Sequence, residues 1–251
     1  MSGAVDPWDA VRARVAQQVH YLRNPLKPAP SICYVCCGPV TGPWSRCYPC
    51  EQHLRAAQSG VADLVVPISY AVKGAQHAHG LAAYKAVRVP SLEIRGNLLD
   101  LLMFFVKDHL GCVAEAARVT RWSHIAVVPS TKNRAGQHPL RALIGDRMGL
   151  PWVDLSVNPR IHSDTREFRA DWFKVSDGNI GGGRVLLIDD TWTTGSRIQS
   201  VAYALKQAGA QRTAAIVLGR HANPSWDAWK SILGTIRDRP FRLDSCLVHN
   251  R

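Results

Sequence analysis

The chain has 251 residues, 46% of them hydrophobic, which is enough to bury the core of one sizeable domain with an appendage. Its first 23 residues carry charges throughout, and its most apolar stretch, Leu98–Val106, is too short to cross a bilayer and contains Asp100, so we expect a cytoplasmic protein with no membrane insertion. The formal net charge of +12 predicts an anionic partner and leaves a phosphorylated small molecule, a nucleic acid and an acidic protein open.

The chain begins with a predicted amphipathic helix over residues 7–22, which places Val11, Val15 and Val19 on one side. The segment NPLKPAPS then ends the helix, because its prolines disfavour helix continuation. We therefore divide the chain into an N-terminal helix and linker (1–30), a cysteine-rich module (31–58), an α/β domain (59–221) and a C-terminal helix and tail (222–251).

Five of the seven cysteines lie in the segment CYVCCGPVTGPWSRCYPC, which spans residues 33–50. They include two C-x-x-C pairs, Cys33 with Cys36 and Cys47 with Cys50. Two such pairs supply the four thiolates of a tetrahedral zinc site, and four protein ligands leave no position open for catalysis. The sequence therefore predicts a small, zinc-ribbon-like module that holds a structural Zn²⁺ ion.

The ligand set of this module has alternatives in the sequence. Cys37 lies beside the first cysteine pair and His53 just after the second, so either side chain could replace one thiolate. The competing interpretation of the whole cluster is a set of reduced, buried thiols without metal. Cys112 and Cys246 stand alone in the sequence and are predicted to be simple core residues.

From residue 62 onward, strand-like and helix-like segments alternate. Such an order predicts an α/β fold with a mostly parallel sheet flanked by helices. The predicted strands cover residues 63–72 (as one strand or a hairpin), 123–130, 151–157, 184–190 and 212–220, and the predicted helices cover residues 93–110, 138–150 and 196–209.

Two adjacent carboxylates, Asp189 and Asp190, follow a run of aliphatic residues at the carboxyl end of a predicted buried strand. The next segment, 193–196, opens a helix, and backbone amides at a helix start form a cradle for phosphate. The carboxylates repel phosphate but suit hydroxyl groups or a divalent cation, so a sugar phosphate satisfies both halves of the motif. The alternative is that the two acids only cap the following turn.

Two further segments carry basic side chains. The predicted strand at 123–130 leads into a loop with Lys132 and Arg134, and an aperiodic stretch between residues 158 and 180 includes Arg166 and Arg169. Ligands of open α/β sheets collect at the carboxyl ends of strands, and long loops inside a domain are usually functional or disordered. Both segments are therefore candidate anion-binding elements, although each arginine taken singly fits a surface charge better than a ligand, because exposed arginine is common.

The segment VLLIDDTWTTGS resembles the phosphoribosyl-diphosphate signature of the type I phosphoribosyltransferases. Together with the two cysteine pairs ahead of it, the chain resembles the ComF family of phosphoribosyltransferase-like proteins, which is associated with competence for DNA uptake. The resemblance covers Cys33–Leu54, more loosely the segment AAYK at 82–85, and then Ile125–Gly219. It implies a type I phosphoribosyltransferase-like domain over residues 59–221.

The resemblance implies roles for particular residues. Asp189 and Asp190 would hold the ribose 2- and 3-hydroxyls, Lys132 and Arg134 would contact the diphosphate with Mg²⁺, and Arg166 and Arg169 would close over the site. The loop that would enclose the 5-phosphate contains Thr191, Thr193, Thr194, Gly195 and Ser196.

The chain also departs from the family pattern. Members commonly carry RGFNQ where this sequence has RAGQHP at 134–139, and the Asn that often follows the lid arginine is missing. Where 6-oxopurine enzymes carry an aspartate base, this chain has Thr193, whose hydroxyl has no usable pKa, so purine salvage of that type is disfavoured.

Two functional hypotheses follow. In the first, the protein binds phosphoribosyl diphosphate or a related sugar phosphate and transfers the phosphoribosyl group to a nitrogen acceptor. In the second, it is a catalytically silent ComF-like protein that binds single-stranded DNA or proteins of the competence machinery. A zinc adaptor without a ligand pocket is a third interpretation, which leaves the loop after Asp190 unexplained.

Overall fold

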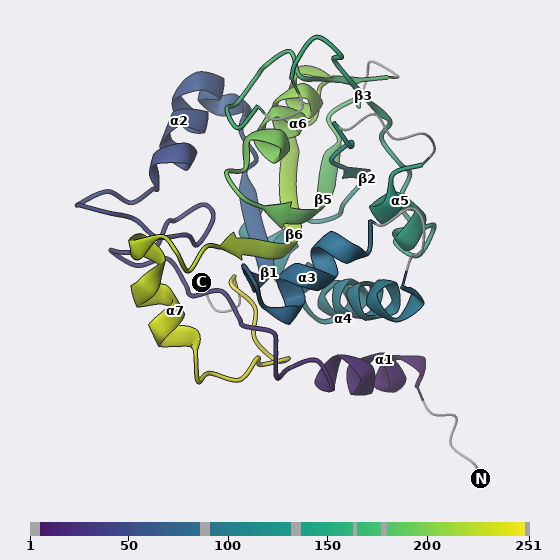
Figure 1. The fold of residues 1–251 in the computed structure, drawn as a ribbon. Helices are drawn as coiled ribbons and strands as arrows, with labels where there is room; N and C mark the ends of the chain where they lie inside the picture. Colours follow the sequence, from purple (N-terminus) through teal and green to yellow (C-terminus); the bar gives the residue numbers. More distant parts are fainter. Residues whose placement is uncertain (1–5, 86–90, 132–136, 163–164, 177–179, 249–251) are drawn as a thin grey trace.

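The computed structural model describes residues 6–85, 91–131, 137–162, 165–176 and 180–248. Its centre is a four-stranded sheet in which every neighbouring pair is parallel, in the order β1-β6-β5-β2 (Figure 1). The strands are β1 (Leu64–Val72), β2 (His124–Val127), β5 (Arg184–Trp192) and β6 (Arg212–Ala222). The sheet and its helices confirm the predicted α/β architecture with a mostly parallel sheet flanked by helices.

Both faces of the sheet are covered, which explains why its central strands are apolar almost throughout. On one face the core includes side chains of α3 (Gln76–Ala83) and α4 (Leu92–Ala116). On the other face it includes α6 (Ser196–Gln207), with α2 (Tyr48–Ala57) and its cysteine module beyond it. The cysteine module is therefore part of the packing of the main domain.

The N-terminal helix α1 (Pro7–Ala16) packs on α4, as Figure 1 shows. Two ion pairs join the helices: Arg14 Nε lies 2.5 Å from Asp100 Oδ2, and Arg12 pairs with Asp108. Helix α1 ends before residue 22, where the sequence pattern placed its end, and residues 17–21 form turns.

The remaining boundaries refine the sequence predictions. Residues 64–72 form one strand and no hairpin, since β1 pairs in parallel with β6 along its length. The predicted helix at 138–150 is shortened to α5 (Pro139–Ile144), because Gly145 adopts a left-handed φ of 54°.

The predicted strand at 151–157 divides between two sheets. Trp152 forms a parallel bridge with Ile125 at the edge of the main sheet, whereas β3 (Leu155–Val157) pairs antiparallel with β4 (Phe173–Val175). Strand β4 lies in the stretch that shows no periodicity in the sequence, because three residues are too few to reveal an alternation.

The C-terminal part of the chain packs against β1 and the core beside it. After β6, the short helical turn η2 (Asp227–Trp229) leads into α7 (Lys230–Ile236). Much earlier in the chain, a similar short turn, η1 (Gln58–Gly60), lies between α2 and β1. Trp229 packs edge-on against Tyr70 of β1, with ring centroids 5.8 Å apart. Within the described ranges, no helix combines the length and apolarity that crossing a bilayer requires.

Candidate functional site

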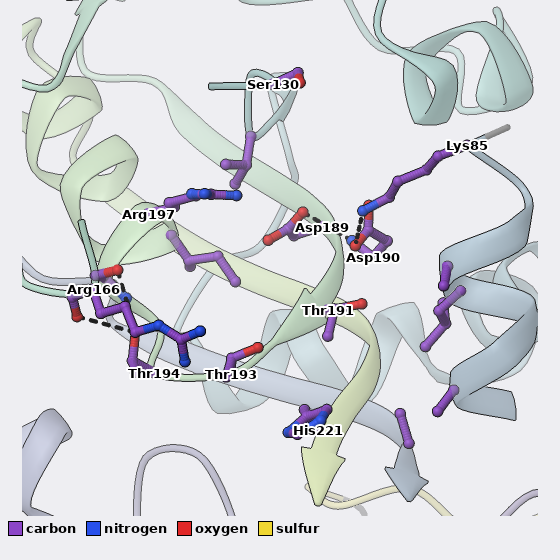
Figure 2. A pocket seen from close by; sticks show the side chains of 18 of the residues that line it. Lys85, Ser130, Arg166, Asp189, Asp190, Thr191, Thr193, Thr194, Arg197 and His221 are labelled. Carbon is purple, nitrogen blue, oxygen red and sulfur yellow. Dashed lines mark hydrogen bonds and ion pairs between the residues drawn. The ribbon is translucent and has the colours of Figure 1, made fainter. Parts of the chain in front are cut away.

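A cavity of about 720 Å³ lies at the carboxyl ends of the parallel strands (Figure 2). The end of β5 and the loop that follows it form one wall, and α3 with the residues before it forms another. Each of the signature residues predicted to bind a sugar phosphate lines this cavity: Asp189, Asp190, Thr191, Thr193, Thr194, Gly195 and Ser196. The sequence motif therefore coincides with a real concavity, in the place where open α/β sheets bind ligands.

Asp190 is held in place by two partners from the end of α3. Tyr84 Oη donates a hydrogen bond to Asp190 Oδ2 at 2.6 Å, and Lys85 Nζ lies 2.8 Å from Oδ1 and 2.7 Å from Oδ2. The aspartate is only 4% exposed, so both contacts stabilise its charge in a place that water hardly reaches. Asp190 is thus a fixed carboxylate with its charge balanced by Lys85.

The side chain of Asp189 lies on the opposite face of β5 from that of Asp190, because successive side chains of a strand alternate between its two faces. Its Oδ1 accepts a hydrogen bond from the backbone N–H of Asp190 at 2.9 Å. Burial and the neighbouring Asp190 carboxylate raise the pKa of Asp189 well above its usual range, and Lys85 and Arg197 offset this only in part. The carboxyl group of Asp189 faces the cavity, where Figure 2 shows it near Arg197.

The loop after β5 has a fixed turn at Gly195. Its φ of 87° is left-handed, and a Cβ atom there would lie 2.0 Å from Cζ2 of Trp192. Thr194 Oγ1 donates to the carbonyl oxygen of Arg166 at 3.1 Å and lies 3.2 Å from Ser196 Oγ. Helix α6 starts directly after Gly195, which has no side chain to cap it, so its first turn presents the positive end of the helix dipole to the cavity.

The structure describes two of the four predicted basic residues, and only one of these two lines the cavity. Arg166 lines the cavity beside the loop. Arg169 Nε lies 3.6 Å from Asp171 Oδ1. Arg169 is not among the described residues that line the cavity, so no contact in the structure supports the prediction that it closes over the site. Lys132 and Arg134 lie outside the described residues.

Other basic residues of the cavity were not assigned from the sequence motif. Arg197 follows Ser196 in the first turn of α6, and its adjacency to the loop was a usable signal. Lys73 directly follows β1, His79 lies within α3, and His221 lies near the end of β6. The parallel pairing of β1 with β6 brings His221 near the other two, which are far from it in the sequence.

The four cysteines of the two C-x-x-C pairs form a buried cluster. The sulfur atoms of Cys33, Cys36, Cys47 and Cys50 all lie within 4.8 Å of one another, and the Cys36 and Cys47 sulfurs are 3.7 Å apart. Hydrogen bonds among the thiols lower the pKa of Cys36 and raise the pKa values of Cys47 and Cys50, so the support for a metal here comes from the geometry and the ligand type. The cluster is compatible with a structural zinc site.

Neither alternative ligand belongs to this cluster in the described part of the chain. Cys37 has a left-handed φ of 56°, and its carbonyl oxygen accepts a hydrogen bond from Tyr70 Oη at 2.8 Å. His53 is 2% exposed, and burial lowers the pKa of its imidazole to about 4. We therefore keep the four cysteines of the paired motifs as the ligand set.

One buried guanidinium joins the cysteine cluster to the cavity loop. Arg220 of β6 donates through Nε to the carbonyl oxygen of Cys36 at 3.0 Å, and its Nη2 lies 3.4 Å from the Cys36 sulfur. Its Nη1 donates to three more backbone carbonyls, those of Trp192 (3.2 Å), Thr193 (3.2 Å) and His221 (2.6 Å). The loop that lines the cavity is therefore anchored to the same side chain as the cysteine module.

Cys246 is buried in the hydrophobic core and Cys112 packs partly buried against it, as the sequence predicts, but the two lie close together. The structure brings both together with His109, with one potential ligand atom of each residue within 4.8 Å of the others. The sequence could not show this, because Cys246 is far along the chain from the other two.

Searches against known protein families and against curated proteins found no match for this chain. The fold and the site define an α/β protein with a polar cavity at the carboxyl edge of a parallel sheet and a buried four-cysteine cluster. Any narrower assignment depends on the motif and on the geometry described above.

Proposed function

We propose that this protein is a phosphoribosyltransferase-like protein of the ComF type, which binds phosphoribosyl diphosphate and transfers the phosphoribosyl group to a nitrogen acceptor. The observation that carries the proposal is the juxtaposition, in one cavity, of an uncapped helix start and two acids on opposite faces of one strand end. A phosphate suits the first feature and a sugar diol suits the second.

Each group has a distinct role in this proposal. The backbone amides at the start of α6, with Arg166 and Arg197, would bind the 5-phosphate. Asp189 and Asp190 would accept hydrogen bonds from the ribose hydroxyls, and Lys85 would keep Asp190 oriented. Because the bond at ribose C1 breaks as pyrophosphate leaves and a bond to nitrogen forms, catalysis would consist mainly of positioning and of stabilising charge.

Magnesium requires few protein ligands, because it usually keeps several waters and binds through one or two carboxylates together with substrate phosphates. Among the described residues, the groups of three or more ligating side chains are the four-cysteine cluster and the His109 cluster, and neither includes Asp189 or Asp190. In the proposal, Mg²⁺ arrives with the diphosphate as part of the substrate, and the protein steps above do not depend on a magnesium ligand.

Calorimetry with phosphoribosyl diphosphate and Mg²⁺ tests the binding half of the proposal. We expect saturable binding by the wild-type protein and about a threefold to tenfold weaker affinity after Asp189→Asn, because the ribose hydroxyls lose one hydrogen-bonding oxygen worth about 0.5–1.5 kcal/mol. The matched control is Asp227→Asn, whose carboxylate is 86% exposed and pairs with Lys230 away from the cavity. Absence of binding by the wild-type protein would refute the proposal.

Turnover is tested separately from binding. The full chain is incubated with labelled phosphoribosyl diphosphate and a pool of nucleobases and amines, and pyrophosphate release is measured. Release that depends on an acceptor supports transfer. Binding without such release supports the second candidate, a catalytically silent protein.

The net charge of +12 favours nucleic acid as the partner of such a silent protein. Its affinity for single-stranded DNA should then fall steeply as salt is raised, because counterion release drives the binding of basic proteins to nucleic acid. Affinity that is absent at low salt would exclude this candidate.

A further inference from the structure

Three side chains that can bind metal lie close together at α4: two belong to this helix, and the third comes from the C-terminal segment. His109 and Cys112 are three positions apart on this helix and so lie on the same side of it. Cys246 comes from the segment after α7. His109 and Cys246 are buried, Cys112 is partly exposed, and one potential ligand atom of each residue lies within 4.8 Å of the other two.

The ring of His109 is held in place by a backbone carbonyl and by two aromatic side chains. Its Nε2 lies 3.0 Å from the carbonyl oxygen of Leu243. A carbonyl can only accept a hydrogen bond, so Nε2 carries the proton and the lone pair resides on Nδ1. A hydrogen bond of this kind to one ring nitrogen fixes the orientation of histidines that bind metal through the other nitrogen. Phe104 and Phe105 pack on the ring at centroid distances of 6.4 and 5.2 Å and restrict it further.

We propose that His109, Cys112 and Cys246 bind a second Zn²⁺ ion, separate from that of the four-cysteine cluster. Cysteine thiolates and histidine imidazoles are typical zinc ligands, whereas magnesium and calcium prefer oxygen ligands. The sequence adds a supporting pattern, because two residues separate His109 from Cys112. Spacings of this kind are typical of zinc ligand pairs.

The function of this site is to attach the C-terminal segment to α4. None of the three ligands is among the residues that line the cavity, so the metal does not take part in the proposed chemistry. It joins a helix that covers the sheet to a segment near residue 246, where the secondary structure consists of turns. The inference is therefore independent of the proposed function.

Metal analysis of the full chain tests the proposal. The wild-type protein, purified without chelator and desalted, should contain two zinc ions per chain, and the double variant Cys112→Ser/Cys246→Ser should contain one. Ser245→Ala is the matched control, because Ser245 is next to Cys246 but has no thiol with which to bind zinc. This variant should retain two zinc ions per chain. One zinc ion in the wild-type protein and the same number in the double variant would overturn the proposal.

A second measurement needs no variant and so does not depend on the folding of the double mutant. Cysteines of the wild-type protein are alkylated before and after removal of zinc with a chelator, and the modified peptides are identified by mass spectrometry. Cys112 and Cys246 should be protected in the zinc-loaded protein and should react at least tenfold faster after chelation. Cys112 is partly exposed, so equal reaction rates in both states would show that no metal covers it and would also overturn the proposal.

Discussion

Two independent features disfavour any residue other than glycine at position 195. Its φ of 87° is left-handed, and an added Cβ would clash with the indole of Trp192. We expect Gly195→Ala to lower the free energy of unfolding by about 1–3 kcal/mol, since both the strain and the contact must be relieved. The same change should weaken binding of phosphoribosyl diphosphate at least tenfold, because the start of α6 moves with the loop. Chemical denaturation and calorimetry measure the two effects.

The control for this substitution is Gly96→Ala. Gly96 lies in α4, is exposed, and has no atom within 4 Å of the position of an added Cβ. In a helix, alanine is favoured over glycine by about 1 kcal/mol, so this variant should be as stable as the wild type or more stable. Equal behaviour of the two variants would contradict the role assigned to Gly195.

Asp189 should make the stability of the protein depend on pH in an unusual direction. Burial and the Asp190 carboxylate raise its pKa in the folded state, so folding favours its protonated form. Its contribution to stability is complete below the pKa of an unfolded aspartate, about 3.9, and is lost as the pH rises through the raised folded value. Asp189→Asn should therefore become more stable relative to the wild type as the pH rises over that window.

Denaturant unfolding at a series of pH values measures this difference. The exposed Asp227→Asn serves as its reference, because that carboxylate is 86% exposed and should give a difference from the wild type that hardly changes with pH. A stability difference for Asp189→Asn that falls as the pH rises would show that the carboxylate is stabilised in the folded protein, contrary to the expectation.

Several site residues could be recognised in the sequence because their chemistry is local. Asp189, Asp190 and the loop to Ser196 are consecutive, so the strand, the turn and the helix start can be read from one segment. Lys73 and His221 had no such local signal, because their meeting depends on which strands become neighbours. The two C-x-x-C pairs were predictable for the same local reason, whereas the proximity of Cys112 to Cys246 was not.

At the scale of elements, the end of α3 supplies both partners of Asp190. Tyr84 and Lys85 are adjacent residues, and each contacts the carboxylate. Lys85→Met should lower the free energy of unfolding by about 2 kcal/mol, because it leaves a buried carboxylate with only one of its partners. The side chain of Lys85 is 30% exposed, and solvent screening keeps the expected loss below that of a fully buried pair.

A double-mutant cycle separates this ion pair from the packing of the lysine side chain. Asp190→Asn removes the charge that Lys85 balances, so the double variant should be less destabilised than the sum of the two single variants. Strict additivity of the two losses would show that the pair contributes nothing to stability. Tyr84→Phe, tested alongside, removes only the hydrogen bond of 2.6 Å and should cost about 1–2 kcal/mol.

The strand boundaries show where sequence patterns lose their power. The long apolar runs that became β5 and β6 were predicted correctly, since burial on both faces leaves a strong signal. Strands β3 and β4 have three residues each and pair with each other outside the main sheet. Their register depends on a tertiary contact, and no short pattern encodes it.

At the scale of the whole molecule, Arg220 connects two regions that the sequence divides into separate domains. Arg220→Lys removes the planar fork that serves Cys36, Trp192 and Thr193 together, and lysine has too few donors in that geometry to replace it. We expect hydrogen exchange of residues 191–196 to accelerate at least about tenfold, since each lost hydrogen bond contributes about 1 kcal/mol.

Removal of the zinc that we expect in the four-cysteine cluster should produce the same acceleration in the wild-type protein. Hydrogen exchange measured by mass spectrometry, with and without chelator, tests this expectation without any ligand. Arg212→Lys is the control, because Arg212 also belongs to β6 but is directed toward Asp63, with Nη1 3.3 Å from Oδ1. Unchanged exchange of residues 191–196 in Arg220→Lys would show that the loop is held by other contacts.

The shared anchor at Arg220 changes how genetic data on this protein should be interpreted. An allele that replaces Cys36 would disturb the turn near Thr193 through the guanidinium, and the phenotype would match that of an allele in the turn itself. Loss of activity in a cysteine allele would then be an effect of architecture and would say nothing about a chemical role for the metal. A suppressor that restores such an allele should be sought along β6, where the two regions meet.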